Sequence, residues 1–161
     1  MPSEPTVEKL EQRAKNVLLF QLSRSMKTRY QLAQILKKRE IPDAIADAVL
    51  DRFTEAQLID DAAFAKAFVN SRLAISGKSK TVIARELKQR GVSALDAEQA
   101  LSAIDSDLED QTAFNVAKKR YQQLTNLEPE VRRRRLMGFL LRRGFSAGLA
   151  GRILRDLEQS E

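Results

Sequence analysis

Residues 81–92 read TVIARELKQRGV, and closely similar stretches occur as YQLAQILKKREI at residues 30–41 and RRLMGFLLRRGF at residues 134–145. In each copy the apolar residues recur at helical spacing, and the copy ends with a basic residue, a turn position and an apolar residue. This pattern is typical of an amphipathic helix that stops at a tight turn. The three copies are offset by 51 and then 53 residues, which indicates an internal repeat.

The same two offsets align apolar residues well outside these stretches. The aligned sets are Val17, Phe68 and Tyr121; Leu32, Ile83 and Leu136; Leu36, Leu87 and Leu140; Ile41, Val92 and Phe145; Leu50, Leu101 and Leu154; and Phe53, Ile104 and Leu157. Equivalent apolar positions in a repeat bury their side chains in equivalent places. We therefore expect these residues to form the cores of three similar units.

The rest of the sequence favours helices throughout. Proline occurs only at positions 2, 5, 42 and 129, and no stretch shows the sustained alternation of a strand. Thr28 followed by Gln31 is a capping box, and Gly77, Gly91 and Gly144 stand where helices are expected to end. The predicted fold is all-α, with about nine helices.

These helices are expected to form three tandem three-helix repeats. The predicted repeats cover residues 9–57, 58–107 and 108–158, preceded by a flexible N-terminal tail at residues 1–8. Units of about 50 residues bury little surface alone, so neighbouring units must stack. The prediction is an elongated, curved array with one extended binding surface.

The composition excludes several kinds of chemistry. The 161 residues include no Cys and no His, so disulfides, Cys/His zinc sites and Ser-His-Asp triads are ruled out. No phosphate-binding loop or dinucleotide-binding turn is present. The acidic pair Asp60-Asp61 fits a helix start better than a metal site, and residues 105–110 lack the spacing of a calcium loop. We expect a protein that is not an enzyme and has neither cofactor nor metal.

The sequence also predicts a location. The longest apolar run, residues 136–141, is far shorter than the roughly 20 residues of a membrane span. The N-terminus has no basic start followed by an apolar stretch, and cysteine is absent. The expectation is a cytoplasmic monomer without a membrane segment.

Positive charge gathers in two stretches of the chain. The formal net charge is +6; residues 62–92 hold seven basic residues and one acid, and residues 131–155 hold eight arginines and no acid. A helical wheel places Arg85, Lys88 and Arg134 opposite the apolar face, whereas Arg132 falls close to the core side. The predicted binding residues are Arg72, Lys78, Lys80, Arg85, Lys88, Arg134, Arg135 and Arg142, which would contact carboxylates or phosphates. The alternative is that these charges are merely solvated helix faces.

The aromatic residues do not suggest a base-stacking surface. Phe139 and Phe145 occupy expected core positions, and only Tyr30 is expected to point outward. The basic helix of each unit is the second of three and lacks the Asn or Gln neighbours that read bases. A freestanding helical DNA-binding protein that uses basic faces on phosphates nevertheless stays open as an alternative. A scaffold that binds only proteins is a third possibility.

Three stretches together resemble the RecX family of bacterial recombinase regulators. They are LIDDAAFAKAFVNSR at residues 58–72, the block at residues 77–92, and FLLRRGF at residues 139–145, and the match runs over roughly residues 14–157. The first repeat departs from the family pattern at Gln31 and Glu40, so its turn is expected to be capped differently.

The resemblance implies a non-catalytic, all-helical regulator of RecA. Such a protein would lie in the groove of the RecA filament on single-stranded DNA. It would inhibit strand exchange, ATP hydrolysis and co-protease activity, by blocking filament extension or promoting disassembly. The family can also bind DNA directly, single-stranded or duplex, and acts in DNA recombination, repair and the SOS response.

Overall fold

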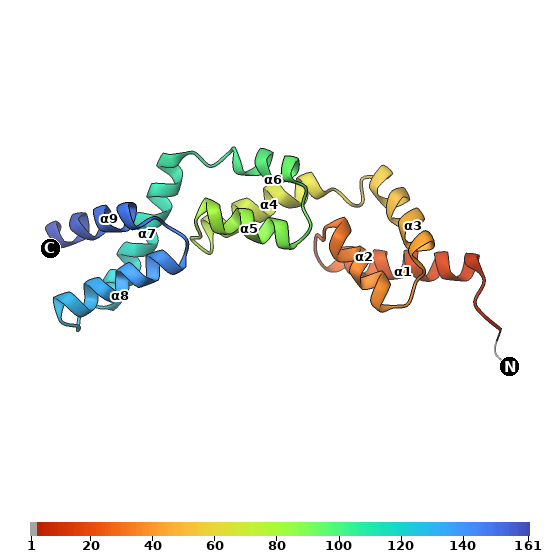
Figure 1. Ribbon diagram of the computed structural model, residues 1–161, viewed down its shortest axis with the longest axis horizontal. Helices are drawn as coiled ribbons and strands as arrows, with labels where there is room; N and C mark the ends of the chain where they lie inside the picture. The colour runs from red at the N-terminus through yellow and green to blue at the C-terminus, as the bar shows by residue number, and fades with distance from the viewer. Residues whose placement is uncertain (1–2) are drawn as a thin grey trace. The chain divides into compact units, whose positions relative to one another are not determined.

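The computed structural model describes residues 3–161, which form nine α-helices and no strand (Figure 1). The prediction of an all-α chain of about nine helices is therefore confirmed. The helices follow one another as repeat 1 (α1–α3), repeat 2 (α4–α6) and repeat 3 (α7–α9). Their bounds are α1 Val7–Arg24, α2 Arg29–Lys38, α3 Asp43–Glu55, α4 Asp61–Ala74, α5 Lys80–Gln89, α6 Ala94–Leu101, α7 Ser106–Gln123, α8 Pro129–Arg142 and α9 Ala147–Gln159.

The exact repeat boundaries given above remain predictions. Of the tail predicted at residues 1–8, residues 1–2 lie outside the described residues, and helix α1 already begins at Val7.

By packing, the chain divides into two compact units. Unit 1 consists of Met1–Lys66 and Leu87–Ala97, and unit 2 consists of Ala67–Glu86 and Glu98–Glu161. Repeat 2 is therefore shared, because each unit combines one terminal repeat with the part of repeat 2 that contacts it.

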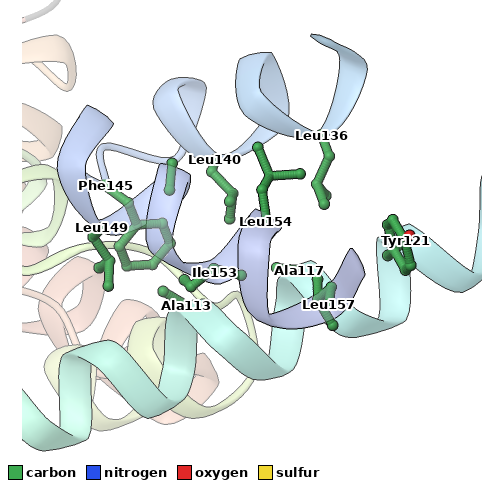
Figure 2. Packing of buried hydrophobic residues seen from close by; sticks show 11 residues of the cluster. Ala113, Ala117, Tyr121, Leu136, Leu140, Phe145, Leu149, Ile153, Leu154 and Leu157 are labelled. Atoms are coloured by element: carbon green, nitrogen blue, oxygen red, sulfur yellow. The ribbon is translucent and has the colours of Figure 1, made fainter. Parts of the chain in front are cut away.

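Each unit has its own apolar core. In unit 1, helices α1, α2 and α3 pack around Leu18, Leu36 and Leu50. In unit 2, helices α7, α8 and α9 pack around Leu140 and Leu154 (Figure 2). Of the eighteen apolar residues that the repeat offsets align, sixteen are buried, with exposed fractions of at most 8%. Val17 and Phe68 are half-buried instead. The predicted core positions are thus confirmed except at these two residues.

The turn after the second helix has the same backbone in all three repeats. Glu40, Gly91 and Gly144 all have positive φ, at 61°, 79° and 92°. In each case the next residue donates its N–H to the leucine carbonyl five positions back, as Ile41 does to Leu36 at 3.1 Å. This is the helix ending that favours glycine. The expectation of a differently capped first turn is therefore wrong, since Glu40 adopts the glycine-type conformation itself.

Within unit 1, repeats 1 and 2 meet at the start of helix α2. Thr28, which caps α2 with the predicted capping box, is fully buried and donates its hydroxyl to the carbonyl of Arg90 at 2.6 Å. The N–H of Arg29 donates to a carboxylate oxygen of Asp61 at 2.9 Å. The turn at Gly91 lies so close to Tyr30 that a Cβ atom at position 91 would collide with that ring.

Within unit 2, repeats 2 and 3 meet in the same way at the start of helix α5. The N–H of Ser79 donates to the carbonyl of Arg143 at 3.1 Å, and the N–H of Lys80 donates to a carboxylate oxygen of Glu109 at 2.9 Å. A Cβ atom at Gly144 would collide with Ser79 and Val82. The two joints use positions that the repeat offsets relate, namely Thr28 and Ser79, Arg29 and Lys80, and Arg90 and Arg143. The carboxylate acceptors Asp61 and Glu109 are not related by these offsets. Shared positions of this kind let a tandem array propagate its packing.

Candidate anion-binding cleft

Unit 2 contains an open cleft of about 890 Å³, here called the basic cleft. Its wall is formed by the turn after helix α4, by α5, by the second half of α7, and by α8 with the residue that follows it. Six of its residues carry positive charge and only one carries negative charge. The lining residues are Ile75, Ser76, Lys78, Val82, Arg85, Glu86, Val116, Lys119, Arg120, Gln123, Phe139, Arg142 and Arg143.

Three of these cations are available to a ligand. Arg85 on α5, Lys119 on α7 and Arg142 on α8 are exposed. None of them takes part in an ion pair among residues 3–161. Because they come from three different helices, they can approach one ligand from different sides. Arg85 and Arg142 were expected at a binding surface, whereas Lys119 was not.

Glu86 binds two of the other predicted residues. Its carboxylate lies 3.1 Å from Nε of Arg72 and also pairs with Nζ of Lys78. The Arg72 guanidinium further lies over the ring of Phe68, at 4.7 Å from its centroid. An ion pair of this kind must be broken before either cation can serve a ligand, so Arg72 and Lys78 are less available than the sequence suggested.

Phe139 packs against the core of unit 2 and also forms part of the cleft wall. The sequence placed it on the inward face of its helix, but the side chain is only half-buried and lines the cleft. The guanidinium carbons of Arg143 and Arg120 lie 4.6 and 5.7 Å from its ring centroid. Arg143 also donates to the carbonyl of Ser76. These two arginines are therefore held by cation–π contacts, which fix the shape of the wall.

The remaining predicted residues lie elsewhere. Lys80 is half-buried, and its Nζ donates to the carbonyl of Ile104 at 3.4 Å. Lys88 is exposed on the last turn of α5, in the part of that helix that belongs to unit 1. Arg134 and Arg135 are exposed on α8 but do not line the cleft. The structure brings Lys78, Arg85 and Arg142 together in the lining of the cleft, and Glu86 joins Arg72 to Lys78.

Three lining cations were missed in the sequence, namely Lys119, Arg120 and Arg143. The basic run Lys118-Lys119-Arg120 near the end of α7 was a usable signal, because it follows an acidic helix start. A wheel drawn for one helix does not show which other helix faces it, so this run could not be joined to α5 and α8.

Arg132 is withdrawn from the surface, as the wheel indicated. It is 9% exposed, its guanidinium lies 3.2 Å from the centroid of Tyr121, and it pairs with Glu161 at 2.6 Å. Hydrogen bonds from Arg132 and Tyr121 lower the pKa of the Glu161 carboxyl. Burial, and the hydrogen bond to Glu161, raise the pKa of Tyr121. The run Arg132 to Arg135 therefore does not act as one patch.

One aromatic residue was misplaced at the sequence level. Phe20 is 55% exposed, slightly more than Tyr30 at 47%, so Tyr30 is not alone in pointing outward. The guanidinium of Arg24 lies 5.5 Å from the Phe20 centroid. Both residues belong to unit 1 and are separate from the basic cleft.

The arrangement in the cleft is suited to binding an anion. Guanidinium and ammonium groups form charge-assisted hydrogen bonds with carboxylates and phosphates. Among the described residues, no group of three or more acidic side chains is placed to hold a metal ion. None of the helices in residues 3–161 has the length and apolarity needed to cross a bilayer. The fold and the cleft together define a helical-repeat protein with a basic cleft.

Comparison with known proteins places this repeat in a family. Models of the first, second and third three-helix domains of RecX match residues 14–53, 60–101 and 107–154. The chain is 44% identical over 154 residues to the regulatory protein RecX of Thermobifida fusca, covering 96% of this chain and 83% of the relative. It is 40% identical over 158 residues to that of Streptomyces coelicolor, covering 98% and 84%. The chain belongs to the RecX family of regulatory proteins.

Solved structures agree on the fold. The crystal structure of RecX from Lactobacillus salivarius has a TM-score of 0.78 at 22% identity and covers 93% of this chain and 97% of that one. A second crystal structure of a regulatory protein RecX has the same TM-score at 24% identity, covering 91% of this chain and 72% of that one. The prediction of three tandem three-helix domains is thereby confirmed.

Proposed function

We propose that this protein regulates RecA without catalysing a reaction. It binds in the groove of the RecA filament on single-stranded DNA and inhibits strand exchange, ATP hydrolysis and co-protease activity, by blocking filament extension or promoting disassembly. It acts in the cytoplasm, where the filament forms. Membership of a family of regulatory proteins supports the regulatory role.

The observation that carries the proposal is the basic cleft with its three available cations, Arg85, Lys119 and Arg142. A RecA filament presents two kinds of anion, the carboxylates of its subunits and the phosphates of the DNA inside it. Cations that already lie on a formed wall lose little freedom on binding, so most of the interaction energy is retained. The other predicted residues, Lys88, Arg134 and Arg135, are exposed and add to the field that attracts the filament.

The test is the rate of RecA-dependent ATP hydrolysis on single-stranded DNA as this protein is titrated in. The double substitution Arg85→Glu with Arg142→Glu should raise the concentration needed for inhibition about 100-fold. Two lost charge-assisted contacts at about 1.5 kcal/mol each give that factor. Both residues are exposed, so helicity and melting temperature should stay unchanged.

A matched control lies in the same unit. Arg152 and Arg155 are exposed on α9 and line a second cleft of about 530 Å³ that also contains Asp107, Asp110 and Asp156. Reversing Arg152 and Arg155 to Glu makes the same change in net charge outside the basic cleft. This variant should inhibit almost as well as the wild type. Equal loss in the two double variants would mean that net charge, and not the cleft, governs binding.

The alternative is a freestanding DNA-binding protein. Measuring the affinity for DNA at increasing salt, without RecA, distinguishes it from the proposed regulator. Weak binding that falls steeply with salt is the general phosphate contribution. Tight, sequence-selective binding at physiological salt would favour the alternative.

A further inference from the structure

We infer that the basic cleft binds an acidic peptide segment of its partner protein, one that carries an aliphatic side chain among its carboxylates. This inference rests on the proposed function and names the part of the filament that the cleft recognises. DNA phosphates are the competing ligand.

The first argument is the apolar part of the cleft. Ile75 lines it and is 83% exposed, the largest exposed fraction recorded among the large apolar side chains. Val82 and Val116 line the same cleft from α5 and α7. An aliphatic group that remains this exposed gains most when another apolar group covers it. The sugar-phosphate backbone of DNA offers no such group, whereas a leucine, isoleucine or valine in a peptide does.

The second argument is the state of the cleft's aromatic ring. A single-stranded nucleic acid usually gains affinity by stacking its bases on exposed rings. Phe139 is half-buried, and the guanidinium groups of Arg120 and Arg143 already lie over it. A base would have to displace these two cations. The ring is thus a support for arginines and not a free stacking surface.

The third argument is that the cleft already holds a carboxylate. Glu86 lies in the wall and pairs with Lys78 of the cleft as well as with Arg72. The geometry of this wall is therefore compatible with side-chain carboxylates bound by ammonium and guanidinium groups. Arg85, Lys119 and Arg142 would bind further carboxylates, those of the ligand. Charge complementarity thus favours an acidic segment, and Ile75 requires an apolar residue within it.

The experiment measures binding of two labelled synthetic peptides to the full chain. One contains only Asp and Glu with a central Leu, and the other has Ser in place of that Leu. The wild type should bind the Leu peptide about tenfold more tightly, the gain expected for largely burying one such side chain. Ile75→Ser should remove most of this preference.

Leu95→Ser is the matched control, because Leu95 is 65% exposed on α6 and does not line the cleft. This variant should keep the full preference for the Leu peptide. Unlabelled oligothymidylate serves as the phosphate competitor, and it should displace the Leu peptide poorly. Equal affinity for both peptides, or tight displacement by oligothymidylate that Ile75→Ser leaves unchanged, would overturn the inference in favour of phosphates.

Inhibition of RecA separates this inference from the proposed function. If Arg85→Glu with Arg142→Glu abolishes inhibition but Ile75→Ser leaves it unchanged, the cleft acts on the filament and the peptide inference falls. If the wild type shows the Leu preference but never slows ATP hydrolysis, the peptide inference stands and the proposed function falls.

Discussion

The turns at Glu40 and Gly144 have almost the same backbone but different surroundings. Both have positive φ, and both place the next residue, Ile41 or Phe145, in a core. Gly144 lies against Ser79 and Val82 of the preceding repeat, with no room for a Cβ atom. Glu40 is exposed, and no repeat precedes it among the described residues. The glycine is therefore required by the neighbouring repeat more than by the turn.

This difference separates two free-energy costs of placing a non-glycine residue at such a turn, namely backbone strain and collision with a neighbour. A non-glycine residue in the left-handed region costs about 1–2 kcal/mol through its own backbone. A collision with a packed neighbour adds about 1–3 kcal/mol. At position 40 only the first cost applies, and the fold tolerates it. At position 144 both apply, and the residue is glycine.

The largest effect on stability is expected at Leu36 and Leu140, the equivalent leucines of the two turns. Leu36 and Leu140 are fully buried, and each accepts the hydrogen bond that closes its turn. Leu36→Ala and Leu140→Ala should each lower the free energy of unfolding by about 2–5 kcal/mol, because each leaves a cavity in a core. Urea denaturation followed by circular dichroism measures both. A loss below about 0.5 kcal/mol for either, the range of surface substitutions, would break the equivalence of the repeats there.

The next effect tests the difference between the two turns. Gly144→Ala should destabilise unit 2 by about 2–4 kcal/mol, since it combines backbone strain with the collision against Ser79 and Val82. Glu40→Ala is the matched control, because it keeps a Cβ atom in the same conformation on an open surface. It should change the free energy of unfolding by less than about 0.5 kcal/mol. If both variants lose the same amount, the neighbouring repeat does not dictate the glycine.

The smallest effect has the opposite sign. Glu40→Gly should stabilise unit 1 by about 0.5–1 kcal/mol, because relief of backbone strain exceeds the added flexibility of the unfolded chain. Thermal unfolding of this variant beside the wild type would show a raised melting temperature. A lowered melting temperature would indicate that the Glu40 side chain makes a stabilising contribution that exceeds the strain.

Most of the fold was predictable because residues that recur at equivalent positions of a repeat occupy equivalent places in its core. One helix alone does not show whether Leu36 is buried, but the apolar residues Leu87 and Leu140 at the equivalent positions identify a core site. Helix caps were predictable for a similar reason, since Thr28 with Gln31 acts within a few residues of chain.

The cleft was predictable only in part. Helical spacing correctly turned Arg85 outward and Arg132 inward. It could not reveal that Glu86 binds Arg72 and Lys78, because that contact depends on how the turn after α4 folds back against α5. Nor could it add Lys119, which reaches the cleft only through the packing of α7 beside α8.

The two joints between repeats have a further consequence. Three of their four hydrogen bonds are donated by backbone N–H groups, and two are accepted by backbone carbonyls, those of Arg90 and Arg143. Three of the four bonds also need one side chain, the hydroxyl of Thr28 or the carboxylate of Asp61 or Glu109, and none of these residues is exposed. Mutations that alter the outward-facing residues of these helices therefore leave the connections largely intact, so the surface can diverge to follow a changing partner while the scaffold stays the same.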